Sequence, residues 1–414
     1  MRILFFSDYY PPEVNAAATR VHERARLWVR EGHDVTVITS VPNFPQGRVH
    51  AGYRNRLWQS EIIDGVKVVR VWTFVAANEG TVRRFLDFLS YMVTSFIFAW
   101  REKRPDIVTS TSPQFFCAVA AWAHASMRRL PYVFELSDLW PASITALGAM
   151  KPGLLMRWME QLELHLYRSA DSVVALTEDF RRDLTSRGIA PGKIYVVRNG
   201  VDLSQYSPRP RDAARAAELG LTDTFTLAYI GTHGVAHALD NLLRAAKLVA
   251  ATAPQVRFLL VGDGAARDDL LKLQKELRLS NVLIAGPQPK ADMPSWWSIA
   301  DVAIVSLRNI ELFSGVIPSK IFEAMGMGLP ILFVAPEGEA SRIVTDAGCG
   351  IAVPPEDPRA LADAVTALAA DPARVARFRK ASIAAAPKHS RTEQAQKMLE
   401  VYRAVLEARA ASRL

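Results

Sequence analysis

The chain has 414 residues, 50% apolar and 22% charged, which excludes a disordered or fibrous protein and exceeds what one hydrophobic core usually holds. Its two cysteines, Cys117 and Cys349, are far apart, which excludes a disulfide scaffold or cysteine zinc site and fits a reducing cytosol. The net charge is +8, and residues 1–200 carry 25 Lys and Arg against 19 Asp and Glu. This excess is either a solvated basic face or the mark of an anionic partner such as a membrane surface; nothing in the pattern favours nucleic acid.

The first half of the chain alternates short β-branched runs with longer helical patterns. The apolar run before Asp8 is too short for a signal peptide and is typical of a first buried strand. Most strand runs are apolar without alternation, as expected for parallel strands buried on both faces. The predicted strands are Arg2–Phe6, Val35–Ile38, Val66–Val71, Ile107–Ser110, Tyr132–Glu135, Val173–Ala175 and Ile194–Val197, and the predicted helices include Ala17–Glu31 and Leu154–Ser169.

The segment Phe85–Trp100 is predicted to be a helix that is apolar nearly all round, and Arg101, Lys103 and Arg104 follow it at once. It is shorter than the roughly 20 residues needed to cross a bilayer. Two interpretations, which do not exclude each other, remain open. The helix is either sandwiched in the core of the first domain, or it forms an apolar and basic patch that lies on an anionic membrane.

Asp138 follows the predicted strand Tyr132–Glu135 and is flanked by Trp140 and Pro141. Ligands of parallel sheets bind at the carboxyl ends of the strands, so Asp138 is the candidate catalytic acid or base. The alternative is an aspartate that caps a following helix. Glu135, a carboxylate inside a buried strand, requires a partner, for which Arg198 is the candidate.

A polar stretch with two prolines separates the halves, and the strand–helix alternation then restarts. The predicted fold is therefore α/β, with two doubly wound, Rossmann-like domains facing a cleft. The predicted domains are residues 1–203 and 225–389, with a linker at 204–224 and a helix at about 390–414 that packs back on the first domain. The predicted strands are Phe225–Ile230, Arg257–Val261, Val282–Ala285, Val302–Val305 and Ile331–Val334, and the helices include Leu239–Ala250, Lys320–Met327 and Leu361–Leu368.

The segment Ser314–Phe333 holds the strongest candidate site. Pro318 suits the first turn of a helix, whose opening would offer backbone amides and a positive dipole end to an anion. Lys320 in that turn and Glu323 three residues later share one face of the helix. This pattern predicts an ammonium beside a diphosphate and a carboxylate that accepts hydrogen bonds from a ribose. The alternative is an ordinary Lys–Glu pair on the surface.

Two glycine-bearing loops follow predicted strands, one with Gly231 and Gly234 and one with Gly262, Asp263 and Gly264. Glycines there allow the backbone to approach a ligand closely, although strand–helix turns also use them for geometry alone. The first strand is not followed by Gly-x-Gly-x-x-Gly, which argues against a nicotinamide or flavin enzyme.

Taken in order, these segments resemble the retaining glycosyltransferases of family 4 over essentially the whole chain. The combination of Glu135–Pro141 (ELSDLWP) with Pro318–Lys320 (PSK) is similar to a bacterial O-antigen and capsule subgroup of the N-acetylfucosamine type. The segments that carry the resemblance are Asp8–Thr39, Arg198–Asp202 (RNGVD), Tyr229–Gly234 (YIGTHG), Leu259–Gly264 (LLVGDG), Ala300–Leu307 (ADVAIVSL) and the Glu-Ala-Met and Gly-Leu-Pro of Ser314–Phe333.

The resemblance implies a GT-B fold, a ribose-binding role for Glu323, and an approach of Asn15 and Ala16 to donor phosphate and acceptor. Two features depart from the family. Gly315 stands where a second glutamate is usual, and His233 and His237 stand where a basic pair is usual. The candidate donor-binding residues are Gly231, Thr232, His233, Gly234, Gly262, Asp263, Gly264, Gly315, Val316, Ile317, Ser319, Lys320 and Glu323, with Lys320 also catalytic.

The implied activity is transfer, with retention, of an N-acetylated or 6-deoxy hexose from a UDP-sugar or other nucleoside-diphosphate sugar. The expected acceptor is a polyprenyl-diphosphate-linked glycan in lipopolysaccharide O-antigen, capsule or exopolysaccharide synthesis. No metal and no cofactor are expected, because Lys320 would neutralise the departing diphosphate. The basic first half and the segment 85–104 place the expected enzyme in the cytoplasm, peripheral on the inner face of the plasma membrane. A sugar-nucleotide epimerase and a non-catalytic, membrane-associated scaffold are the two alternatives.

Overall fold

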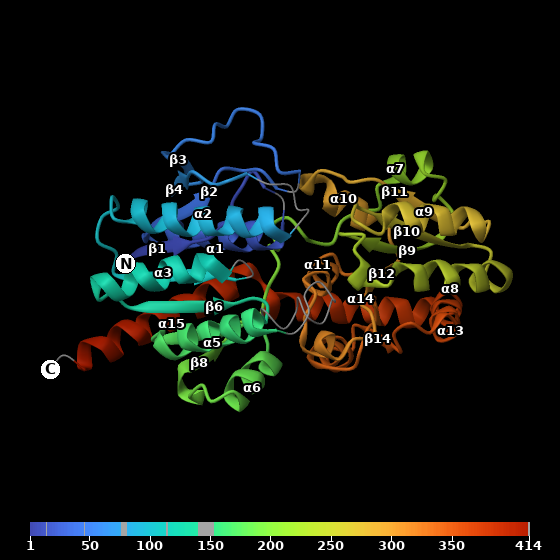
Figure 1. Cartoon of the computed structure of the whole chain (residues 1–414). Helices are drawn as coiled ribbons and strands as arrows, with labels where there is room; N and C mark the ends of the chain where they lie inside the picture. The colour runs from blue at the N-terminus through green and yellow to red at the C-terminus, as the bar shows by residue number, and fades with distance from the viewer. Residues whose placement is uncertain (14, 45, 76–80, 113–114, 140–152, 413–414) are drawn as a thin grey trace. The chain divides into compact units, whose positions relative to one another are not determined.

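The computed structural model describes residues 1–13, 15–44, 46–75, 81–112, 115–139 and 153–412. The chain forms two compact units (Figure 1). The first comprises Met1–Asn199 together with Gln394–Leu414, and the second comprises Gly200–Glu393. Each unit has one sheet with helices against it, so the predicted fold class of two doubly wound α/β sheets is confirmed.

The first unit is built on a sheet with the strand order β3-β4-β2-β1-β5-β6-β7-β8, in which only β3 and β4 pair antiparallel. The strand order reverses between β1 and β5, which is where ligands of doubly wound sheets bind, outside the carboxyl ends of the strands. The strands are β1 (Arg2–Phe6), β2 (Asp34–Ser40), β3 (Trp58–Ile63), β4 (Val66–Val71), β5 (Ile107–Thr111), β6 (Tyr132–Leu136), β7 (Ser172–Ala175) and β8 (Ile194–Val196).

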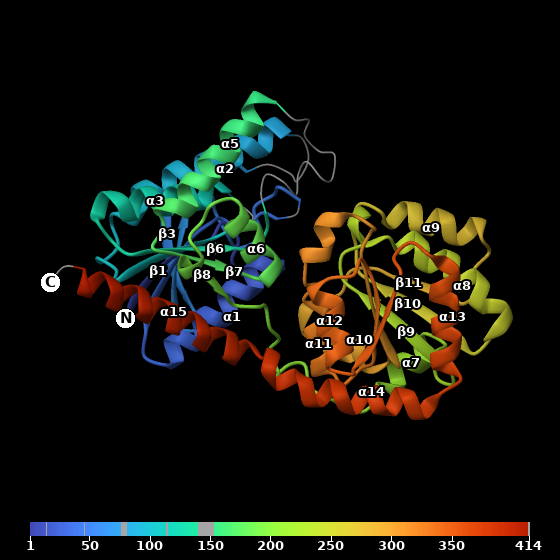
Figure 2. The ribbon, with the colours of Figure 1, turned by 90° about the horizontal axis from the view of Figure 1, so that it is seen from below.

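Helices cover both faces of this sheet. The helices α2 (Thr81–Ala99), α3 (Phe115–Arg128) and α5 (Leu154–Ser169) lie on one face, and α1 (Ala16–Arg30) and α15 (Arg391–Ala411) lie on the other (Figure 2). A further helix, α6 (Glu178–Ser186), connects β7 to β8. A central strand of this sheet such as β1 therefore has apolar neighbours on both faces, as its continuous apolar run requires.

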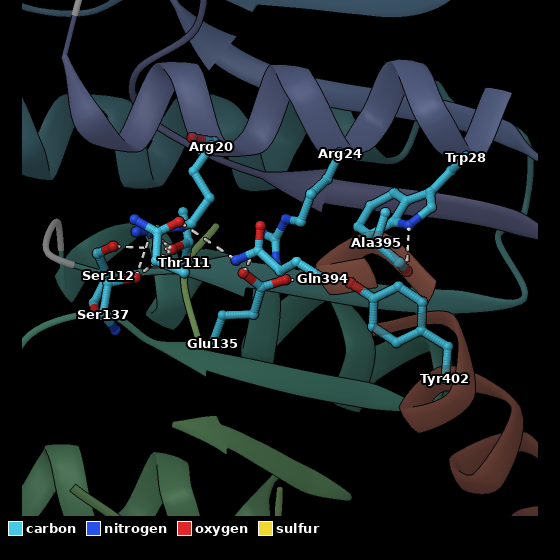
Figure 3. Close-up of polar contacts among 12 residues, drawn as sticks. Arg20, Arg24, Trp28, Thr111, Ser112, Glu135, Ser137, Gln394, Ala395 and Tyr402 are labelled. Atoms are coloured by element: carbon cyan, nitrogen blue, oxygen red, sulfur yellow. Dashed lines mark hydrogen bonds and ion pairs between the residues drawn. The ribbon is translucent and has the colours of Figure 1, made fainter. Parts of the chain in front are cut away.

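Helix α15 contributes to the core of the first unit, although it is far from the rest of that unit in sequence. Met398, Leu399 and Tyr402 are fully buried in the same apolar cluster as Phe5 of β1. The indole Nε1 of Trp28 in α1 donates a hydrogen bond to the carbonyl of Ala395 at 3.0 Å (Figure 3). The last helix thus packs on one face of the sheet of the first unit and belongs to its core.

The buried carboxylate of Glu135 in β6 is paired with Arg24 of α1, with Arg24 Nη2 2.5 Å from Glu135 Oε2 (Figure 3). The hydroxyl of Tyr402 also donates to Glu135 Oε1, at 3.3 Å. The prediction that Arg198 is the partner of Glu135 is therefore wrong. The reason is that the helix packed over β6 supplies the guanidinium, whereas sequence spacing does not show which helix lies there.

The second unit has a fully parallel sheet with the order β11-β10-β9-β12-β13-β14, which reverses between β9 and β12. Alternate residues of β9 face two separate cores, Ala228 in one and Tyr229 in the other. The elements are β9 (Phe225–Ile230), α8 (Leu239–Thr252), β10 (Val256–Val261), α9 (Arg267–Glu276), β11 (Val282–Ala285), α10 (Met293–Ser298), β12 (Val302–Ser306), α11 (Lys320–Gly326), β13 (Ile331–Val334), α12 (Glu339–Asp346), β14 (Gly350–Val353), α13 (Pro358–Ala369) and α14 (Pro372–Ala385).

Two strands and one boundary differ from the sequence analysis. The strands β3 and β14 were not predicted, because β3 is a half-exposed edge strand with polar residues and β14 is a short edge strand that begins with Gly350. Residues 204–224, assigned to a linker, lie inside the second unit. They include helix α7 (Ala213–Glu218), and Ala216 and Leu221 belong to the core there.

Candidate functional site

The carboxyl ends of β9 and β10 meet in two loops that are packed together without room for side chains. Gly231 and Gly262 have φ of +139° and +143°, and a Cβ on Gly262 would lie 2.0 Å from the carbonyl oxygen of Gly231. The amide of His233 donates to the carbonyl of Asp263 at 2.8 Å. A Cβ on Gly264 would lie 2.6 Å from the carbonyl oxygen of His233. Glycine is therefore required here by close approach, and the two predicted loops form one structure.

Lys320 is the first residue of α11, and its side chain reaches the end of β9. Its ammonium donates a hydrogen bond to the hydroxyl of Tyr229 and lies 3.7 Å from the centre of the Tyr229 ring. A Cβ added to Gly231 would lie 2.5 Å from Lys320 Cε. Pro318 precedes the helix instead of lying in its first turn, which corrects the prediction: Ser319 is the N-cap residue. The amine is thus placed beside the glycine loop, at the strand-order reversal.

The charge on Lys320 is poorly stabilised in this position. Burial lowers its pKa to about 7, against a smaller raising effect of Glu323. No ion pair of Lys320 is found among the described residues. A lysine that exchanges its proton near neutral pH is typical of a functional site, because a purely structural lysine is usually solvated or paired.

Two histidines lie next to this amine. His233 is fully buried, and neither of its ring nitrogens has a hydrogen-bond partner among the described residues. Its ring centroid is 6.1 Å from that of Tyr229, and that of His237 is 5.8 Å away. Burial, and then the charge of Lys320, lower the pKa of His233 to about 4 and that of His237 to about 3. Both are therefore neutral at pH 7, and only Lys320 of these three supplies positive charge there.

Glu323, one turn after Lys320, is half-buried, and its Oε2 accepts a hydrogen bond from the indole Nε1 of Trp297 in α10 at 3.3 Å. The next residues before α11, Val316 and Ile317, follow a short 3₁₀ turn, Glu311–Gly315. Gly315 is buried at the end of that turn. The structure therefore brings Lys320, Glu323 and the loop of Gly231 into one region of the second unit.

The corresponding edge of the first unit holds Asp138, one residue beyond Ser137 at the end of β6. The Oγ of Ser112, after β5, accepts hydrogen bonds from the amides of Ser137 (2.7 Å) and Asp138 (3.2 Å). Arg20 of α1 donates to Thr111 Oγ1 at 2.9 Å and to the hydroxyl of Ser137 (Figure 3). These contacts fix the backbone that carries Asp138, whereas Trp140 and Pro141 lie outside the described residues.

Asn15 and Ala16 lie at the start of α1. Asn15 is its N-cap, and its Oδ1 accepts a hydrogen bond from the amide of Ala18 at 2.9 Å; Ala16 is the first helical residue. This contact gives Asn15 a structural role in helix capping. Tyr229 and Arg20 are site residues that sequence reasoning missed, because a tyrosine in an apolar strand and an arginine in a charged helix carry no distinctive pattern.

The predicted apolar helix is α2, and only one side of it is core. Tyr91 and Ser95 are fully buried, whereas a stripe of Leu86, Val93 and Ile97 is exposed. Phe85, one residue before Leu86, and Trp100, just after the helix, are exposed too. We call these five residues the α2 surface. The basic side chains that flank it are also exposed: Arg83, Arg84, Arg101, Lys103 and Arg104.

Within the described residues, no helix has the length and apolar character needed to cross a membrane. No group of three or more His, Cys, Asp and Glu side chains arranged for a metal ion is found in the same part of the chain.

Comparison with known families defines the class of protein. A glycosyl transferase 4-like domain matches residues 15–200, and a glycosyl transferases group 1 domain matches residues 224–371. The solved structure of HepE from Anabaena in complex with UDP has the same GT-B fold, with a TM-score of 0.71 at 18% identity over 98% of this chain and 100% of HepE. The two domain matches and the curated relatives together show that the protein is a glycosyltransferase.

Two curated relatives are glycosyltransferases, and the name of one of them gives the polysaccharide it helps to make. The chain is 24% identical to WcaI of Escherichia coli strain K12, a glycosyl transferase named for colanic acid biosynthesis, over 79% of this chain and 82% of WcaI. It is 27% identical to the glycosyltransferase WbjE of Pseudomonas aeruginosa over 69% of this chain and 70% of WbjE. These relatives give the epimerase and scaffold alternatives no support.

Proposed function

We propose that the enzyme transfers a sugar from a UDP-sugar, or another nucleoside-diphosphate sugar, to a lipid-linked glycan, with the donor held by the second unit. The observation that carries this proposal is the amine of Lys320, placed beside Gly231 at the carboxyl end of β9. The structure of HepE, a protein of the same fold, in complex with UDP supports a uridine nucleotide as part of the donor. The colanic acid process named for WcaI supports a polysaccharide product.

In the proposed reaction the diphosphate lies against the glycine loop and Lys320, and the ribose hydroxyls donate to Glu323. As the bond between the anomeric carbon and the diphosphate oxygen breaks, negative charge grows on the diphosphate, and protonated Lys320 stabilises it. A protein cation in this place makes a metal ion unnecessary. The new glycosidic bond forms with retention at the anomeric carbon, and Asp138 accepts the proton of the acceptor hydroxyl.

The acceptor we propose is a polyprenyl-diphosphate-linked sugar in the synthesis of O-antigen, capsule or exopolysaccharide. The resemblance to the N-acetylfucosamine-type subgroup supports an N-acetylated or 6-deoxy hexose as the sugar transferred. A direct assay would therefore test a panel of nucleotide sugars as donors, with a lipid-linked glycan as the acceptor.

The first prediction concerns this assay. A nucleotide-sugar panel should contain a donor that stabilises the enzyme by about 2.7 kcal/mol at 100 times its dissociation constant, measured by thermal shift. With a lipid-linked acceptor, that donor should yield a longer glycan at an unchanged rate in excess EDTA. Loss of transfer in EDTA that magnesium or manganese restores would refute charge neutralisation by Lys320, and conversion of the donor without an acceptor would refute transfer.

We further propose that the enzyme works at an anionic membrane through the α2 surface. The stripe of Leu86, Val93 and Ile97 has the spacing of one helix face, and exposed basic residues stand at both ends of the helix. Such a combination binds anionic lipid surfaces through apolar burial and charge together. A lipid-linked acceptor would be delivered in that plane.

The second prediction tests the α2 surface with liposomes. Changing Arg101, Lys103 and Arg104 to Ser should weaken co-sedimentation with anionic vesicles by about 100-fold, since each basic residue near the surface contributes about 1 kcal/mol. High salt should weaken binding of the unchanged protein as well. A matched control changes Arg181, Arg182 and Lys272, which are exposed elsewhere, to Ser. Equal binding of the two triple variants would leave α2 as a core helix only.

A further inference from the structure

Tyr229 holds the Lys320 side chain in place. It is fully buried in β9, one residue before the strand ends at Ile230 and two residues before Gly231. Its hydroxyl accepts a hydrogen bond from the Lys320 amine and donates one to the carbonyl of Thr232 at 2.7 Å. One hydroxyl thus connects the first residue of α11 to the loop after β9.

The two residues come from opposite sides of the sheet. Tyr229 belongs to the core formed with α8 and α13, whereas Ile321 and Phe322, next to Lys320, belong to the other core. The Lys320 side chain therefore crosses the end of the sheet, where its Cε fills the space that a Cβ on Gly231 would need. Fixing the four rotatable bonds of the lysine side chain in this position costs conformational entropy, and the hydrogen bond at its tip offsets that cost.

We propose that Tyr229 is a positioning residue for the donor reaction: its hydroxyl holds the Lys320 amine at the glycine loop and favours the protonated amine, which a donor diphosphate then binds. This inference rests on the proposed donor site and adds to it the group that sets the charge and place of Lys320. Tyr229 acts through Lys320 and need not touch the donor.

Of the charged and titratable groups around Lys320, Tyr229 is the one that hydrogen-bonds the amine, while Glu323 favours the protonated amine through its charge. From the β9 side, Tyr229, His233 and His237 face it; from α11, Glu323; and Asp263 and Arg267, after β10, act on His233. The pKa of His233 is about 4 and that of His237 about 3, so both stay neutral from pH 5.5 to 8.5. Over that range, the amine with a pKa of about 7 is the group whose charge changes.

The sign of the effect follows from the hydrogen bond. Because the hydroxyl proton is used on Thr232, the hydroxyl oxygen accepts from the amine and stabilises its protonated form. Removing the hydroxyl therefore lowers the pKa of Lys320 further. Above its pKa the free site must take up a proton to bind a diphosphate, so affinity falls by about tenfold for each pH unit.

The test measures the dissociation constant of UDP for the unchanged enzyme and for Tyr229→Phe from pH 5.5 to 8.5 at constant ionic strength. The ratio of the two constants cancels the titration of UDP itself. We expect a ratio near one at pH 5.5 and about tenfold weaker binding by the variant at pH 8, equal to a pKa difference of about one unit. A ratio that is the same at every pH is the result of a merely structural defect and overturns the proposal.

Two more variants distinguish the positioning role of Tyr229 from the proposed donor site on which it rests. Tyr402→Phe removes a buried hydroxyl from the first unit and should leave the UDP profile unchanged. Lys320→Ala should bind UDP weakly, and the only inflection left in its pH profile should be that of UDP itself. If Lys320→Ala binds UDP normally, the donor site itself is refuted. If it binds weakly but Tyr229→Phe follows the unchanged enzyme at all pH values, only the positioning role is refuted.

Discussion

Replacing Lys320 with alanine should lower turnover by about 100- to 1,000-fold, the usual loss when one electrostatic group that meets developing charge is removed. The Michaelis constant of the donor should rise by a smaller factor. Lys320 meets charge that increases as the sugar–phosphate bond breaks, and only interactions that strengthen in the transition state raise the rate constant. Steady-state kinetics at saturating acceptor measures both constants.

Glu323→Gln is the matched comparison, because Glu323 lies on the same helix but would contact the ribose, which does not change in the reaction. Its main effect should be weaker donor binding, by about 1.5–3 kcal/mol for a hydrogen bond to a charged group, at nearly unchanged turnover. An exposed Lys–Glu pair would instead cost less than about 1 kcal/mol of stability with no kinetic effect. Two kinetically silent variants would therefore exclude the proposed donor site.

Changing Asp138 to asparagine should lower turnover by about 100-fold or more if its carboxylate takes the acceptor proton, with donor affinity near normal. The backbone of Ser137 and Asp138 is held by Ser112, so the substitution should leave the loop in place. Turnover and UDP binding are measured on the same preparation. Asp183→Asn, on helix α6 of the same unit, is the control, and a variant of Asp138 with normal turnover would end its assignment as a base.

The parallel strands were predictable because burial on both faces requires continuous apolar runs. Arg2–Phe6 and Phe225–Ile230 are such runs, and the structure has them at the same residues. The edge strand β3 was not predictable in this way, because none of its residues is fully buried and polar and apolar residues are mixed along it, so it has no continuous apolar run. The same limit applies to Glu135: its need for a partner follows from burial, but Arg24 becomes that partner only through the packing of α1 on β6.

At the candidate site, the glycines and Lys320 were predictable because each is unusual where it stands. Gly231 and Gly262 come directly after apolar strands, and Lys320 is a charged residue at the start of a largely apolar helix, two residues after Pro318. Tyr229 was not predictable, since a tyrosine at the end of an apolar strand reads as one more core residue. Only the contact of its hydroxyl with Lys320, a residue 91 positions away, distinguishes it.

The place of α15 has a consequence for how the chain is made. Residues 394–414 complete the first unit. The helix in this segment supplies hydrogen-bond partners to Trp28 and Glu135 and apolar neighbours to the core around Phe5. The second unit is complete at Glu393, so during synthesis it can close before the first one does. At about 5–20 residues per second, synthesis of the second unit alone delays α15 by about 10–40 seconds after Asn199 is made, and the apolar face of α1 and β1 stays uncovered throughout, which makes it the natural client surface for a chaperone on the nascent chain.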